Sequence, residues 1–244
     1  PLEPLGSGSD YSAYLQHLGL ATLDYGYGGE GRSTGVYHSR YDTYEHHSKF
    51  VDPGFVYDAL LAKTVGRAVI KAADSDLPIQ QASDFADAIG QYVGEVKKLA
   101  DDRRTAAENQ KKMLADNVYA LAADPTKPHA NPTALQEVPK FDFAPLDSAA
   151  AKLKSSAKAY DDALTANGAH LPAADQARLQ AVMQSIDQTL LLDKGLPFRD
   201  WYKNTIYAPG RFTGYGAKTL PGVREAIEEE RWNDATQYIG LTAG

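Results

Sequence analysis

The sequence contains no cysteine among its 244 residues. This absence excludes a disulfide scaffold, a thiolate nucleophile and any zinc or iron–sulfur site that depends on cysteine. It does not indicate a compartment, because a chain without cysteine is equally stable in oxidising and reducing surroundings.

An excess of positive charge is also lacking. Lys and Arg number 25 against 32 Asp and Glu, so the formal net charge is −7. The sign is the same along the chain: residues 1–76 carry 6 basic and 10 acidic groups, and residues 77–244 carry 19 and 22. Because no part of the chain is a basic module, we expect no nucleic-acid partner.

Long hydrophobic runs are missing as well. No apolar stretch approaches the roughly 20 residues that are needed to span a bilayer. Hydrophobic residues make up 43% of the chain and charged residues 23%, which is typical of a globular protein. The first residue is Pro1 rather than Met, and we expect the chain to be the C-terminal piece of a longer protein.

The first 50 residues are rich in Gly, Tyr, Ser and His. Ser9-Asp10-Tyr11 predicts the start of a short helix that ends near Gly19. Residues 20–25 read as a short strand, and the glycines of residues 26–31 predict a mobile loop. This loop lacks the spacing of a phosphate-binding loop.

From Asp52-Pro53 onward the pattern becomes helical. An apolar stripe at helical spacing comes first: Phe55, Leu60, Val65, Val69 and Ile70. Helices are expected over about 53–76, 80–124, 147–167 and 173–192, after Pro221-Gly222, and from about Asn233. Within the second of these, Gly90 and Gly94 are the expected weak points, and the proline-rich residues 125–145 are an expected surface loop.

We therefore predict two parts and a mainly α chain. Residues 1–76 form an α/β fragment, and residues 77–244 form an all-α helical bundle. A fragment of about 75 residues with one strand is a poor candidate for an independent domain. We expect it to complete a sheet whose other strands lie outside this chain.

The richest chemistry lies between His38 and His47, where three imidazoles and two carboxylates fall within ten residues. Such a stretch is compatible with a metal site, because histidine is a common metal ligand. The His-Glu-x-x-His zinc motif is absent, however, and a lone histidine is often a hydrogen-bonded structural residue. On the residues alone His38 stays open between these two roles, and His46 and His47 are expected on the solvated surface.

Several short motifs in register resemble the end of the peptidase domain in the glutamate carboxypeptidase (prostate-specific membrane antigen-like) family of zinc peptidases, which also contains the transferrin receptor. They are Leu5-Gly6-Ser7-Gly8-Ser9-Asp10-Tyr11, Leu15-Gln16-His17-Leu18-Gly19, Tyr37-His38-Ser39 with Tyr41-Asp42-Thr43-Tyr44-Glu45, and Asp52-Pro53-Gly54-Phe55. The helical remainder resembles the transferrin-receptor-like dimerisation domain, through Gly195-Leu196-Pro197, Ile206-Tyr207-Ala208-Pro209, Tyr215 and Pro221-Gly222. The resemblance covers essentially the whole chain.

This resemblance implies a co-catalytic site with two zinc ions and a separate glutamate base. His38 corresponds to the last metal ligand, and Tyr37 to a catalytic tyrosine near the scissile carbonyl. Ser7, Gly8 and Ser9 match a loop that lines the substrate cleft, and Tyr215 matches a tyrosine of the pocket for the C-terminal residue. Two zinc ions would acidify a shared water and polarise the peptide carbonyl.

The chain departs from the family pattern around this pocket. Gly214 stands where the family places a lysine before the last tyrosine, and Lys218 and Arg211 are the nearest replacements in sequence. Asp24 and Gly26 stand where the family has arginines that bind acidic side chains, and Ser9 replaces an asparagine of the cleft loop. A carboxylate in place of a guanidinium favours neutral or basic substrates.

We therefore expect the C-terminal part of a carboxypeptidase-like dizinc exopeptidase that acts on short peptides, with carboxypeptidase and aminopeptidase action both left open. The remaining zinc ligands and the base would come from the upstream part of the same peptidase domain, so this chain alone should be inactive. The resemblance also implies a homodimer through the helical domain and an extracytoplasmic location. The alternatives are a non-catalytic, transferrin-receptor-like binding or scaffold protein and a helical dimerisation module only. His38 favours the enzyme, because the transferrin receptor has no histidine there.

Overall fold

The structure is a computed structural model that describes residues 3–28 and 35–244, except for the side chain of residue 169. The chain divides into two compact units. The larger unit contains Pro1–Ala21, Gln80–His170 and Gln184–Gly244, and the smaller contains Thr22–Ile79 and Leu171–Met183. The boundary predicted after residue 76 stays a prediction.

The larger unit begins with one short helical segment, α1 (Tyr11–Ala13) continued by the π-helix η1 (Tyr14–Leu18). It ends as predicted at Gly19, whose φ of 64° is left-handed. A Cβ at Gly19 would lie 2.7 Å from the Cα of Gln188, so a close backbone approach also requires glycine there. The side chain of Asp10 makes no capping hydrogen bond.

The longest helix is α4 (Ala82–Ala115), followed by α5 (Val118–Leu121). The break falls at Asn117, whose φ is 57°, and α4 runs unbroken through Gly90 and Gly94. A glycine inside a helix costs only about 1 kcal/mol, and the packing of α4 along α6 offsets this cost. The predicted weak points are therefore wrong.

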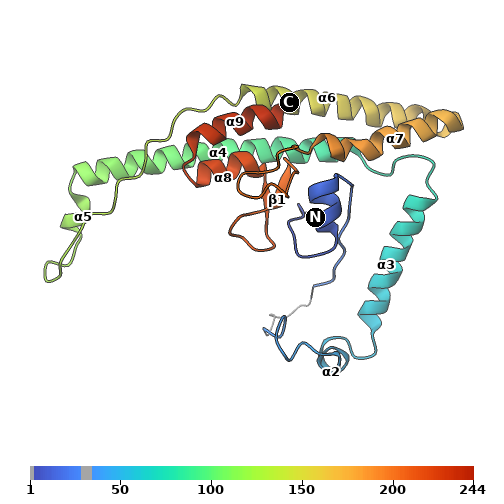
Figure 1. Ribbon diagram of the computed structural model, residues 1–244, viewed down its shortest axis with the longest axis horizontal. Helices are drawn as coiled ribbons and strands as arrows, with labels where there is room; N and C mark the ends of the chain where they lie inside the picture. The colour runs from blue at the N-terminus through green and yellow to red at the C-terminus, as the bar shows by residue number, and fades with distance from the viewer. Residues whose placement is uncertain (1–2, 29–34) are drawn as a thin grey trace. The chain divides into compact units, whose positions relative to one another are not determined.

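Four further helices follow: α6 (Ala144–Asn167), which continues as the 3₁₀-helix η3 (Gly168–His170), α7 (Ala173–Thr189), α8 (Pro221–Glu228) and α9 (Trp232–Ala243). They confirm the predicted helices to within a few residues at each end. Figure 1 shows α4 and α6 side by side, with α8 and α9 against them. The prolines of residues 125–145 lie mostly in the irregular connection before α6, as expected.

The larger unit also contains a small antiparallel hairpin that the sequence did not indicate. Strand β1 (Tyr207–Pro209) pairs with β2 (Ala217–Thr219), with Ala208 opposite Lys218. Three-residue strands are too short to show an alternating pattern. The loop between them, residues 210–216, carries Tyr215.

A single apolar core holds the larger unit together. It joins Ile89, Val93 and Val96 of α4 to Val223 and Ile227 of α8, all at most 7% exposed. Residues of α6 and α9 complete it. Residues 89–239 therefore contribute a core of their own.

The smaller unit contains α2 (Tyr44–His46), the π-helix η2 (His47–Val51) and α3 (Val56–Ala73), besides part of α7. The predicted strand at residues 20–25 is not formed, since a strand needs a neighbour and no described residue pairs with it. Of the predicted glycine loop, residues 26–28 are irregular and residues 29–31 lie outside the described ones.

The chain is mainly helical, which confirms the predicted fold class. Among residues 3–28 and 35–244, no helix combines the length with the apolar composition that crossing a membrane requires.

Candidate functional site

The cleft loop predicted at Ser7, Gly8 and Ser9 contacts Tyr215, about 200 residues further along the chain. The backbone N–H of Ser7 donates to the Tyr215 carbonyl oxygen at 3.3 Å. Gly8 has a φ of 104°, and a Cβ there would lie 2.6 Å from the Tyr215 ring. Only glycine tolerates both this conformation and this approach. The structure thus brings together two of the segments to which the resemblance gave a role in substrate binding.

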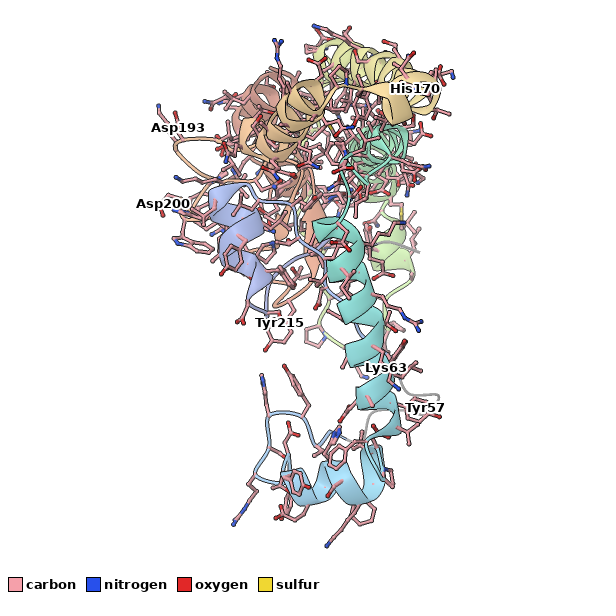
Figure 2. The ribbon with its side chains drawn as sticks, turned by 90° about the vertical axis from the view of Figure 1, so that its right-hand side faces the viewer. Tyr57, Lys63, His170, Asp193, Asp200 and Tyr215 are labelled. Atoms are coloured by element: carbon pink, nitrogen blue, oxygen red, sulfur yellow. The ribbon has the colours of Figure 1, made fainter. Side chains whose placement is uncertain are left out.

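Tyr215 lies in the β1–β2 loop and is 53% exposed, so its ring is available to a ligand (Figure 2). The loop is closed on itself: the Gly210 N–H donates to the Gly216 carbonyl at 3.1 Å, and the Thr213 hydroxyl donates to the same carbonyl at 2.7 Å. Such a closed loop holds Tyr215 in one place.

The other end of this loop is fastened by a buried carboxylate. Glu225 on α8 is only 3% exposed and accepts a hydrogen bond from the Arg211 backbone N–H at 2.9 Å. Arg199 binds the same carboxylate through both terminal nitrogens, at 3.0 and 2.7 Å. A two-point pair of this kind fixes geometry as well as charge.

Both cations considered as replacements for the family's lysine are already paired. Lys218 binds both carboxylate oxygens of Glu228, at 2.8 and 2.9 Å. Arg211 binds Glu229 at 2.6 Å, and its guanidinium lies 4.1 Å from the ring centre of Phe198. The hairpin therefore presents the Tyr215 ring, and the positive charges of Lys218 and Arg211 are neutralised by their partners.

Tyr37 and His38 lie in a tight turn of the smaller unit. The Ser39 N–H donates to the Val36 carbonyl at 2.9 Å, and His38 has a φ of 60°. The His38 backbone N–H donates to the Asp42 carboxylate at 3.3 Å. The His38 imidazole stacks on the Tyr37 ring, with 3.9 Å between the ring centroids. Both side chains are exposed.

The exposed His38 imidazole fits a role as a single zinc ligand. Over residues 3–28 and 35–244, no set of three histidine or acidic side chains that converges on one point includes His38. A tetrahedral zinc site takes three or four protein ligands. The described residues therefore do not form a complete zinc site at His38.

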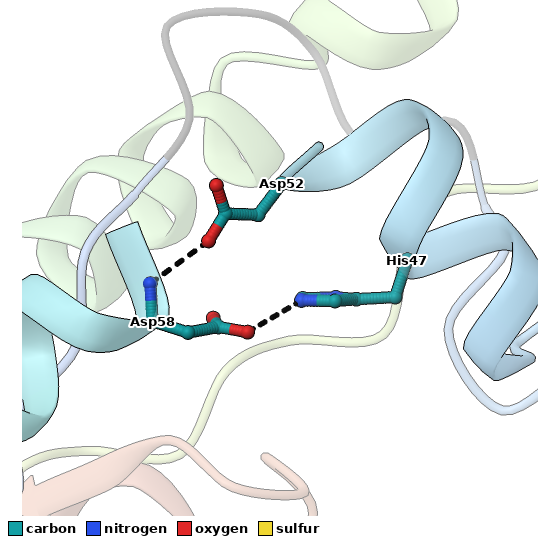
Figure 3. A group of neighbouring side chains, drawn as sticks. All are labelled: His47, Asp52 and Asp58. Carbon is teal, nitrogen blue, oxygen red and sulfur yellow. Dashed lines mark hydrogen bonds and ion pairs between the residues drawn. The ribbon is translucent and has the colours of Figure 1, made fainter. Parts of the chain in front are cut away.

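One cluster of such side chains does form elsewhere in the smaller unit, at His47, Asp52 and Asp58 (Figure 3). The His47 ring nitrogen lies 2.8 Å from the Asp58 carboxylate. Asp52 is 3% exposed and accepts hydrogen bonds from the Val56 and Asp58 backbone N–H groups, at 3.0 and 2.9 Å.

Helix capping accounts for the place of Asp52 in this cluster. Burial away from water raises the pKa of Asp52, but hydrogen bonds from the first N–H groups of α3 outweigh it and bring the pKa below its ordinary value. Asp52 satisfies donors that the first turn of a helix leaves open. The sequence placed His47 on the surface and missed the cluster, although an aspartate just before a helix start is a capping signal.

The sequence model of the family described as "Transferrin receptor-like dimerisation domain" matches residues 141–244. Among curated relatives, a "Probable glutamate carboxypeptidase" of Arthroderma benhamiae is 28% identical over 96% of this chain and 28% of its own length. "Probable glutamate carboxypeptidase LAMP1" of Arabidopsis thaliana is 29% identical over 93% of this chain and 27% of its own length.

"Aminopeptidase NAALADL1" of Rattus norvegicus is 23% identical over 97% of this chain and 29% of its own length. The chain thus spans less than a third of the length of each of these relatives. These similarities confirm the resemblance that the short motifs indicated, over nearly the whole chain.

Proposed function

We propose that this chain, whose residues 141–244 match the sequence model of the transferrin receptor-like dimerisation domain, is the C-terminal part of a carboxypeptidase-like dizinc exopeptidase. It would hydrolyse peptide bonds in short peptides. The observation that carries the proposal is the contact between the Ser7–Ser9 loop and Tyr215. The resemblance assigned these two segments separately to one cleft, and they pack against each other.

The zinc-binding role falls to His38. Its imidazole would be one ligand, and zinc would supply an acidified water and a polarised substrate carbonyl. Tyr37, stacked on His38, is next to this ligand and would act on the same carbonyl. The other ligands and the base would come from the upstream part of the peptidase domain, so this chain by itself would be inactive.

The substrate would be a peptide whose terminal residue is neutral or basic. Lys218 and Arg211 are each held by a carboxylate, at 2.8 and 2.6 Å, so neither is a free cation for an acidic side chain. Asp24 stands where the family has an arginine. A negative charge at that position repels acidic substrates.

The helical domain, residues 77–244, would form a homodimer. The match of its second half to a dimerisation domain supports this assignment. Light scattering on the intact protein at micromolar concentration should give twice the monomer mass, and a monomer would contradict it. The resemblance also supports an extracytoplasmic location as part of this proposal.

The decisive experiment is His38→Ala in the intact protein. Zinc content should fall by at least one ion per chain, and peptidase activity should fall at least about 100-fold, because a lost ligand disturbs the metal more than a lost neighbour does. Zinc is measured by mass spectrometry and activity with a series of short peptides.

His46→Ala is the matched control, because it removes an imidazole from the same segment whose ring lies 5.7 Å from the Phe50 ring. It should leave zinc content and activity unchanged. Wild-type activity in His38→Ala would refute the metal assignment. An intact protein that holds no zinc and cleaves no peptide would instead favour the non-catalytic binding or scaffold protein.

A further inference from the structure

We propose that Gln16 is a positioning residue that holds the Gly6–Ser9 loop against Tyr215 and so sets the affinity for peptide. The effect on peptide affinity rests on the proposed function. The hold of Gln16 on the loop rests only on contacts within the larger unit.

Gln16 is a fully buried polar side chain, 0% exposed, in the π-helical segment η1. Its amide nitrogen donates to two successive carbonyls of the cleft loop, Leu5 and Gly6, each at 3.2 Å. A buried amide is costly unless it is hydrogen-bonded. The side chain therefore stabilises the loop only in the position where both carbonyls reach it.

The main chain around Gln16 is fastened to the segment that leads into the hairpin. The Lys203 N–H donates to the Gln16 carbonyl oxygen at 2.8 Å. Asn204, the residue after Lys203, is 0% exposed. Its side-chain oxygen accepts hydrogen bonds from the Ile206 and Tyr207 N–H groups at 2.9 and 3.2 Å. Tyr207 begins β1, so one continuous set of hydrogen bonds runs from the loop through Gln16 to the start of the hairpin.

The loop has little freedom where it touches the hairpin. A Cβ at Gly6 would lie 2.9 Å from the Ala217 nitrogen, and one at Gly8 would lie 2.6 Å from the Tyr215 ring. The backbone of the loop therefore lies directly against the hairpin, and no side chain fits between them. Without the hydrogen bonds from Gln16 the loop would move away from Tyr215, and the two surfaces of the cleft would separate.

Gln16→Met tests this role, because it keeps the length of the side chain and removes the donor. In the intact protein KM should rise about tenfold with kcat nearly unchanged, the pattern of a lost binding interaction. Hydrogen exchange should quicken in two segments only, residues 5–9 and 211–216. Gln16→Leu, which also removes the donor, serves the same test if Gln16→Met does not fold.

Gln180→Met is the matched control. Its amide also donates to a backbone carbonyl, that of Ser75 at 2.8 Å, but within the smaller unit. It should leave KM and the exchange of both segments unchanged. A Gln16 variant with wild-type exchange in residues 5–9 overturns the inference, as does one that lowers kcat and leaves KM alone. If the wild-type protein cleaves no peptide, the proposed function fails, and exchange still decides whether Gln16 holds the loop.

Discussion

Helices α4 and α3 show the same kind of apolar periodicity but differ in how far their apolar side chains are buried. On α4, Val96 is 0% exposed and Ile89 is 7% exposed. On α3, Val69 and Ile70 are 60% and 61% exposed, and Leu60 is 48% exposed. Every member of the buried apolar cluster lies between residues 89 and 239, and none comes from α3.

The difference shows that a periodic stripe predicts a helix but not what covers it. The face of α4 is covered by α6 and α8, which this chain supplies. Among the described residues, nothing covers the stripe of α3 to a similar degree. A group of exposed apolar residues on one face is typical of an interaction surface. It agrees with the expectation that residues 1–76 are an incomplete domain.

The largest expected contrast comes from removing one isoleucine side chain from each region. Ile227→Ala, at a site that is 0% exposed, should lower the free energy of unfolding by about 3 kcal/mol through lost burial and a cavity. Ile70→Ala, at a site that is 61% exposed, should change it by less than about 0.5 kcal/mol. Urea unfolding of this chain measures both. Equal losses would show that α3 is covered after all.

A smaller contrast comes from adding one methyl group. A Cβ at Gly222 in α8 would lie 2.7 Å from Cγ of the Tyr238 ring, so Gly222→Ala should destabilise the core by about 1–3 kcal/mol. A Cβ at Gly66 in α3 would meet nothing within 4 Å. Gly66→Ala should therefore stabilise α3 by up to about 1 kcal/mol. Thermal melts show whether each variant is more or less stable than the wild type. A destabilised Gly66→Ala would reveal a neighbour of α3.

Much of the helical architecture could be predicted from the sequence because its signals are local. Gly19 ends a helix and Pro221 begins one, as their conformational preferences require. The break in the long helix could not be placed in this way. It falls at Asn117, whose φ is 57°, whereas α4 continues through Gly90 and Gly94, next to the buried residues Ile89 and Val93.

The candidate site was less accessible to local reasoning. No spacing rule connects Gly8 to Tyr215, and only the resemblance assigned both to one cleft. The β1–β2 hairpin that carries Tyr215 is too short to show a pattern. The roles of Gln16 and Glu225 were also invisible, because a buried polar side chain is recognised by its partners and not by its neighbours in sequence.

The smallest expected effects concern the two carboxylates that cap helices in the two regions. Hydrogen bonds from the Ser83 hydroxyl and backbone lower the pKa of Asp161, which caps α4 in the larger unit. The pKa of Asp52, which caps α3, is lowered as well. A lowered folded-state pKa means that each carboxylate stabilises the fold above about pH 4, its ordinary range, and that this contribution is lost as the pH falls further.

Asp161→Asn should therefore lower the urea midpoint at pH 7. It should also reduce the loss of stability between pH 5 and pH 3, the window around the ordinary carboxyl pKa of about 4. Asp52→Asn should leave the urea midpoint of the core nearly unchanged and speed hydrogen exchange at the start of α3, because α3 contributes nothing to that core. The two variants thus test whether the regions are stabilised independently. If Asp52→Asn moved the core transition as far as Asp161→Asn does, the covered and the uncovered helix would share one cooperative unit.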